Sequence, residues 1–259
     1  METGEPLNVG WRNGVPKRFA AYHAADRNFF LLFLVLCWLG VIGGFIPSVT
    51  KRFAGNADYA APLVLQVHVF AFTAWLLLLG MQMALIRWRR PAVHKQLGLA
   101  AIILIPIMAV TALWSEIYSQ QFYFDHPPNS QAFFIVPIAN VIAFTILASA
   151  ALVSRKDAST HKRLILLATT VIAGIAYSRW WGEGLYAAFG DGLWGMIINT
   201  YTGTNLLLAG AVAYDLVTRK RVHRVYEIGV PMLLLSELAV SLIYHAPQWL
   251  PVARYLIGR

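Results

Sequence analysis

Cysteine and charge are both scarce in this chain of 259 residues, which has one cysteine and only 13% charged residues. The single cysteine, Cys37, cannot form an intrachain disulfide or a cysteine-based metal site. It lies within an apolar run, where we expect an ordinary buried thiol. The GxSxG, GxxxxGKS/T and HExxH patterns are also absent from the sequence. No nucleophile elbow, phosphate-binding loop or zinc-protease helix is therefore predicted.

Hydrophobic residues make up 58% of the chain, well above the share in soluble globular proteins. Apolar runs long enough to cross a bilayer occur at about 28–48, 62–87, 97–117, 131–154, 164–181, 193–217 and 226–246. We predict an all-α polytopic membrane protein, with one seven-helix transmembrane domain over 28–259. Residues 1–27 are expected to form a cytoplasmic N-terminal arm. No apolar core precedes Phe29, so this arm does not resemble a secretory signal.

The formal net charge of +9 is concentrated at one side of the predicted bundle. Four Lys or Arg residues lie in the N-terminal arm, and four lie in each turn after the second, fourth and sixth runs. The positive-inside rule then predicts a cytoplasmic N-terminus and an outer C-terminus in a bacterial inner (plasma) membrane. The basic excess is explained by topology, and no nucleic-acid partner is expected.

Each of the three basic turns contains a histidine, namely His94, His161 and His223. Each histidine lies where a helix is expected to begin, at the depth of lipid phosphates. Backbone N–H groups and cationic side chains at such positions favour phosphate. We expect the turns to bind anionic lipid head groups at the cytoplasmic face, with haem or metal ligation as the alternative. They divide the chain into one helix followed by three hairpins, an arrangement found in repeated membrane bundles.

Glu237, in the last apolar run, is the clearest ionisable residue at membrane depth, and Asn205 in the preceding run should lie at a similar height. Such groups are costly in a bilayer and are functional candidates. Two interpretations stay open. Glu237 could be a neutral acid that hydrogen-bonds to the polar run 199–205 and joins two helices. Alternatively, it could accept protons or bind a ligand.

Further polar side chains gather toward the outer ends of the runs. With Glu237, they give the candidate cofactor-binding residues His68, Glu116, Arg179, Glu183, Glu237 and His245. If they converge, they form a pocket facing the periplasm, with His68 and His245 as candidate metal ligands. If they are scattered, they are ordinary interfacial residues, and Arg179 with Glu183 is simply an i,i+4 ion pair.

Several motifs resemble a large family of bacterial membrane proteins without an assigned activity. They are His68-x6-Trp75-x6-Gln82-x2-Leu85-x8-His94-Lys95-Gln96-Leu97-Gly98, the stretch His161–Thr169 with Arg179-Trp180, and Asp215 followed by Arg221-Val222-His223. The resemblance covers about 60–250 and implies the multi-span fold but no chemistry. The first run and the N-terminal arm are not covered by it.

A weaker likeness exists to membrane b-type cytochromes, which hold haem between paired histidines. It would pair His68 with His245, and His94 with His161, although the latter two lie at the ends of their runs. A retinal protein is excluded because no run has an interior lysine. A G-protein-coupled receptor would have the opposite orientation.

Three functions therefore stay open, and the leading hypothesis is binding of a redox cofactor (haem b, a metal ion or a quinone) or a small ligand in the outer pocket. The second is a proton-coupled transporter or receptor for a small solute, which uses Glu237 and Arg179. The third is a non-catalytic assembly or lipid-interacting protein. Glycines Gly40, Gly43, Gly44, Gly203 and Gly210 are expected to allow close helix packing.

Overall fold

The computed structural model describes residues 11–12, 15–16, 19–125 and 131–259. This part of the chain is helical, as predicted, apart from a two-residue strand pair, β1 (Trp11–Arg12) with β2 (Val15–Pro16). The long helices are α1 (Asp26–Phe53), α2 (Leu63–Arg87), α4 (Ala100–Phe122), α5 (Ile135–Val153), α6 (Ala158–Phe189), α7 (Leu193–Arg219) and α8 (Arg224–His245). The short ones are α3 (Pro91–Gly98), α9 (Trp249–Leu256) and the 3-10 turns η1 (Tyr123–Asp125) and η2 (Gln131–Phe134).

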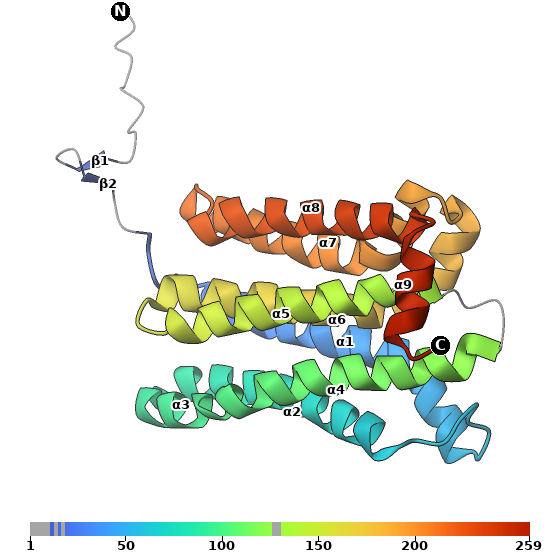
Figure 1. The fold of residues 1–259 in the computed structure, drawn as a ribbon. Helices are drawn as coiled ribbons and strands as arrows, with labels where there is room; N and C mark the ends of the chain where they lie inside the picture. Colours follow the sequence, from blue (N-terminus) through green and yellow to red (C-terminus); the bar gives the residue numbers. More distant parts are fainter. Residues whose placement is uncertain (1–10, 13–14, 17–18, 126–130) are drawn as a thin grey trace, which may run out of the picture.

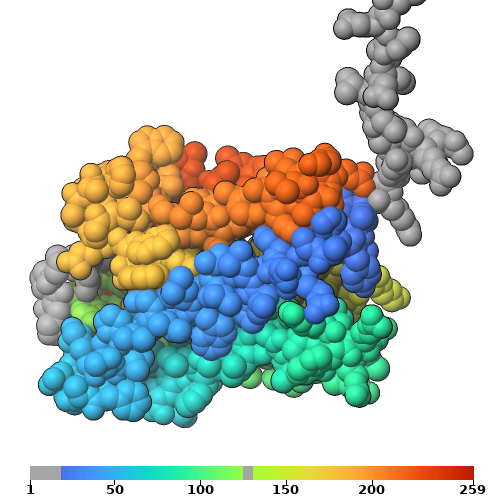
Figure 2. All heavy atoms as spheres, turned by 180° about the vertical axis from the view of Figure 1, so that it is seen from behind, coloured from blue at the N-terminus to red at the C-terminus, as the bar shows by residue number. Residues whose placement is uncertain are grey.

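The long helices run side by side, with α2 and α4 in one layer, α1, α5 and α6 in the next, and α7 and α8 in the third (Figure 1). Helix α6 is the centre of this bundle because it packs against α1, α5, α7 and α8. On the face shown in Figure 2, α1 lies between the α2–α4 layer and the α7–α8 layer.

The two ends of the bundle differ in composition. The start of α1 and the α2–α3, α5–α6 and α7–α8 turns meet at one end, on the left in Figure 1, and we call it the basic end. The other turns and α9 lie at the opposite end, which we call the far end. The predicted clustering of the basic turns on one side is therefore present in the fold.

Six helical segments are long and apolar enough to cross a membrane, as expected of a multi-pass membrane protein. They are Asp26–Phe53, Leu63–Arg87, Pro91–Phe122, Gln131–Val153, Ala158–Phe189 and Arg224–His245. The predicted run 193–217 forms α7, which is long enough but carries the polar residues Asn199, Thr200, Thr202, Thr204 and Asn205. A seventh span, and with it the orientation of the C-terminus, stays a prediction.

Many large apolar side chains lie on the outer surface of the helices, and a few charged groups lie inside. Phe70, Ile103 and Leu235 are among the large hydrophobic side chains that are exposed. Arg163 and Asp215, by contrast, are buried. A bilayer solvates such an apolar surface, whereas water would not.

Glycines allow α1 and α7 to approach α6 closely. A Cβ atom at Gly44 would overlap the backbone carbonyl of Ala176, and one at Gly203 would overlap the side chain of Tyr177. Gly40 and Gly43 likewise lie against aromatic rings of α6. The packing role predicted for these four glycines is confirmed.

The packing prediction was wrong for Gly210. A Cβ there would meet no atom within 4 Å in the described part of the chain, because this residue faces outward from α7.

We predict that alanine destabilises the protein at one of two helical glycines and not at the other. Gly44→Ala should push α1 away from the Ala176 carbonyl and lower the free energy of unfolding by about 1–3 kcal/mol. Gly210→Ala, the matched control, should leave it unchanged or raise it by about 0.5–1 kcal/mol, since alanine favours the helix. Thermal unfolding in detergent, followed by circular dichroism, measures both. Equal destabilisation by the two variants would contradict the packing argument.

Candidate functional site

Two of the residues predicted for the outer pocket lie near each other at the far end. The guanidinium of Arg179 is close enough for its charge to act on the imidazole of His68. Arg179 lies over the ring of Phe45 at 5.1 Å, and His68 contacts the ring of Phe72 at 4.3 Å. Nδ1 of His68 is buried and has no hydrogen-bond partner among the described residues.

The other outer residues do not join this pair. Glu116 accepts a hydrogen bond from Nε2 of Gln120 at 2.8 Å, and Glu183 is exposed. His245 ends α8, which lies in the layer opposite to α2 and His68 (Figure 1). The structure therefore does not gather the predicted residues into one pocket.

The two candidate metal ligands also differ in their hydrogen bonding. The ring nitrogens of His245 lie 2.7 and 2.8 Å from the carbonyl oxygens of Ser241 and Asp191, so neither is free. Within the described residues, no group of three or more His, Cys, Asp or Glu is arranged to hold a metal ion. Joint ligation by His68 and His245 stays a prediction without a shared site.

Glu237 and Asn205 meet between α8 and α7, as the sequence predicted. Nδ2 of Asn205 donates to Oε2 of Glu237 at 2.9 Å, and Glu237 is only 5% exposed. The remaining oxygens, Oε1 of Glu237 and Oδ1 of Asn205, are buried and receive no hydrogen bond from the described part of the protein. Each partner in this pair thus has one satisfied and one unsatisfied polar group.

Most of the polar run on α7 is used in other ways. The side chain of Thr204 fills the space above Gly174 of α6. Thr202 donates to the carbonyl of Ile198 at 2.7 Å, within its own helix. Of these α7 residues, Asn205 is the one that bonds to a carboxyl group.

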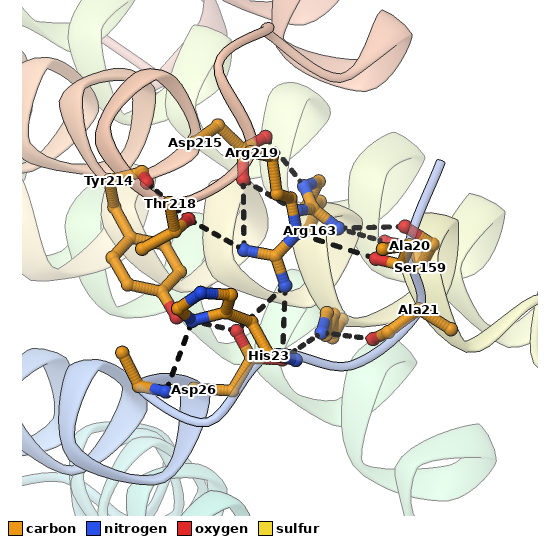
Figure 3. A network of polar contacts seen from close by, with 12 residues as sticks. Ala20, Ala21, His23, Asp26, Ser159, Arg163, Tyr214, Asp215, Thr218 and Arg219 are labelled. Carbon is orange, nitrogen blue, oxygen red and sulfur yellow. Dashed lines mark hydrogen bonds and ion pairs between the residues drawn. The ribbon is translucent and has the colours of Figure 1, made fainter. Parts of the chain in front are cut away.

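The basic end contains a buried ion pair that joins α6 to α7 (Figure 3). Nε and Nη2 of Arg163 donate to the two carboxylate oxygens of Asp215 at 2.8 and 2.5 Å. Arg163 is 2% exposed and Asp215 is fully buried. Nη1 of Arg163 also donates to Ser159, and the backbone N–H of His223 donates to Asp215. Both charges are therefore paired and hydrogen-bonded, as burial requires.

A second carboxylate at this end, Asp26, attaches α1 to the same cluster (Figure 3). It accepts hydrogen bonds from Lys162 at 2.7 Å, from Arg219 at 2.8 Å and from the hydroxyl of Tyr214 at 2.6 Å. Arg219 also lies 3.8 Å from Asp215. Helices α1, α6 and α7 are thus connected by one network of charges.

Phe19, in the N-terminal arm, lies against this network. Its ring lies 4.5 Å from the guanidinium of Arg163, 5.6 Å from that of Arg219 and 4.8 Å from that of Arg221. The ring of His223 contacts it edge-on at 4.6 Å. Cation–π contacts of this kind are strongest where water is excluded.

His223 is bonded inside the protein rather than exposed at its surface. It is 7% exposed, and its Nδ1 accepts the backbone N–H of Val225 at 3.1 Å, which caps α8. Burial, and then the charge of Arg163, lowers the pKa of His223 from 6.5 to about 4. His94 and His161 are half-buried, and lipid phosphate binding at the turns stays a prediction.

Sequence reasoning did not predict the network at the basic end. From the sequence, Arg163 and Arg219 look like part of the topology signal, together with the other cations. A signal was present, because Asp26 and Asp215 are carboxylates among basic residues at the edges of apolar runs. Their partners come from distant segments, and the sequence alone does not show which helices meet.

No family model, curated protein or solved structure matches the chain. The resemblance to the bacterial membrane family therefore stays a prediction.

We predict that removing one charge of the buried pair is far more harmful than replacing both. Asp215→Ala leaves Arg163 unpaired and should lower the free energy of unfolding by about 3–5 kcal/mol. Arg163→Met with Asp215→Leu should recover most of that loss. Glu183→Ala removes an exposed carboxylate and serves as the control, with little expected change. Thermal unfolding in detergent distinguishes them, and equal stability of the single and double variants would contradict the ion-pair argument.

We predict that His223 makes the protein less stable in acid. Its pKa is about 4 in the fold, below the ordinary value of 6.5, so its contribution is complete above pH 6.5 and is lost as the pH falls toward 4. The unfolding midpoint should fall by roughly 5 °C more in the wild type than in His223→Asn between pH 7 and pH 5. Asparagine keeps an N-cap acceptor but does not titrate. Parallel pH profiles for the two proteins would exclude this role.

Proposed function

We propose that this chain is a multi-pass membrane protein that binds and releases a proton at Glu237 during the transport of a small solute. The observation that carries the proposal is the pair of unsatisfied oxygens on Glu237 and Asn205. The proposal takes up the second of the functions predicted from the sequence.

The hydrogen bonds of this pair favour the neutral acid. In the carboxylate form, Oε1 of Glu237 and Oδ1 of Asn205 are two buried acceptors without a donor, an arrangement that costs free energy. A proton on Oε1 would let the carboxyl group donate to Oδ1 while Nδ2 of Asn205 donates to Oε2. One proton would thus pair both unsatisfied oxygens, with an amide and an acid facing each other.

The position of the pair suits a coupling step. It joins α7 to α8. Loss of the proton would remove the hydrogen bond from Oε1 to Oδ1 of Asn205, keep the one from Nδ2 to Oε2, and weaken the contact between the two helices. Helix α8 contains Pro231, which lacks a backbone N–H donor and weakens the helix at the approach to Glu237. Proton transfer at Glu237 could therefore change how α8 packs.

Arg179 takes no part in the proton step of this proposal. It is exposed and lies over Phe45 at the far end, near His68. These two residues are the candidates for binding an anionic group of the solute. A redox cofactor in the same region has less support, because both ring nitrogens of His245 are engaged by carbonyls.

We predict that Glu237→Gln abolishes the proton step without disturbing the fold. Glutamine offers an N–H where the acid has its O–H, so both hydrogen bonds to Asn205 can form, but no proton can be released. Infrared difference spectra at neutral pH should show the carbonyl stretch of a protonated carboxylic acid in the wild type and not in Glu237→Gln. In liposomes that contain a pH-sensitive dye, proton influx driven by a potassium diffusion potential should fall to the protein-free rate.

The matched control is Glu227→Gln, which removes an exposed carboxylate from the same helix and should behave as the wild type in both assays. Two results would overturn the proposal: proton influx in Glu237→Gln equal to that of the wild type, or wild-type influx no faster than in protein-free liposomes. Equal unfolding temperatures for wild type and Glu237→Gln confirm that the fold is kept.

A further inference from the structure

Two of the turn histidines meet at the basic end, although they come from different hairpins. His94 lies in α3 and His161 at the start of α6, and their ring centroids are 6.5 Å apart with perpendicular planes. This contact is separate from the Arg163–Asp215 network and from the Glu237 pair. Neither the fold nor the proposed proton step accounts for it.

Each of the two rings has a nitrogen that is available to bind a ligand. Nδ1 of His161 lies 2.8 Å from the carbonyl oxygen of Ala151. A carbonyl only accepts, so Nδ1 carries the proton and Nε2 keeps its lone pair, as in most metal-binding histidines. Nδ1 of His94 is buried and has no hydrogen-bond partner in the described ranges.

The separation of the rings matches ligation of one metal from both sides. Metal–imidazole bonds are about 2.0–2.1 Å, so two imidazoles on opposite sides of one ion have centroids about 6.4 Å apart. The observed 6.5 Å is close to that separation.

A third polar group lies beside the pair. The backbone of Gln82 in α2 is next to the His94 ring, and the side-chain oxygen Oε1 of Gln82 is another buried acceptor without a donor among the described residues. Of the neighbouring lysines, Lys95 acts on His94, whereas Lys162, next to His161 in the sequence, is paired with Asp26 at 2.7 Å. An amide oxygen here could bind the metal or a water on it.

We propose that His94 and His161 ligate a transition-metal centre that prefers imidazole, either a free divalent ion or the iron of a haem. The site connects the α2–α3 turn to α6 at the basic end. It does not depend on proton transfer at Glu237, so failure of one proposal leaves the other intact.

The test uses the full chain, purified with chelator and then titrated with Co²⁺ or, in a separate arm, with haemin. A free-ion site should bind one Co²⁺ per chain and give its visible ligand-field absorption. A haem site should instead give the Soret shift of imidazole-ligated iron. In whichever titration shows binding, Co²⁺ or haemin, His94→Gln and His161→Gln should each weaken binding at least tenfold. The control His23→Ala should bind as the wild type.

Glutamine at 161 keeps a donor for the Ala151 carbonyl, so these variants should fold, and their unfolding temperatures check this. Binding that neither histidine variant weakens would overturn the proposal, as would the absence of binding in both arms. Loss of binding in His245→Ala but not in His94→Gln would assign the metal to the far end and would also overturn it.

Discussion

A guanidinium and a carboxylate, both almost wholly removed from solvent, hold this bundle together at its basic end. Either charge alone would carry a large desolvation cost in a medium of low dielectric constant. Arg163 of α6 and Asp215 of α7 are joined by two hydrogen bonds. Ser159 accepts a further bond from Arg163, and the backbone N–H of His223 donates one to Asp215. Because α6 is the central helix, this pair fixes the helix against which α1, α5, α7 and α8 pack. Asp26 then extends the same network to α1.

The two halves of the α7–α8 hairpin are consequently held with different strength. At the basic end, Asp215 of α7 accepts the N–H of His223 just before α8 begins. Toward the middle, the side chain of Asn205 donates to that of Glu237, and this contact leaves an acceptor unsatisfied on each partner. Under the proposed function, a change of charge at Glu237 would act on this incompletely bonded contact, away from the ion pair at the basic end.

The helical fold and the Glu237–Asn205 contact could be predicted from the sequence, and the assembled sites could not. Long apolar runs indicate membrane-spanning helices. Two polar residues at equal depth on consecutive helices have few other partners, so a contact between them is expected. The proposed outer pocket depended on how each helix is rotated, which depth does not determine. His245 turns to backbone carbonyls and Glu183 to solvent, so they do not join His68. Similarly, Gly44 and Gly210 look alike in sequence, but only one faces a neighbouring helix.

The partners of Asp26 have a consequence for the order in which the molecule is built. Asp26 begins the first long helix, yet it accepts from Lys162 of α6 and from Tyr214 and Arg219 of α7. During synthesis these residues emerge long after α1, so α1 must wait with an unpaired carboxylate while the intervening helices are made. The basic end can close only when the chain is nearly complete. Its closure therefore cannot come before α7 has been made.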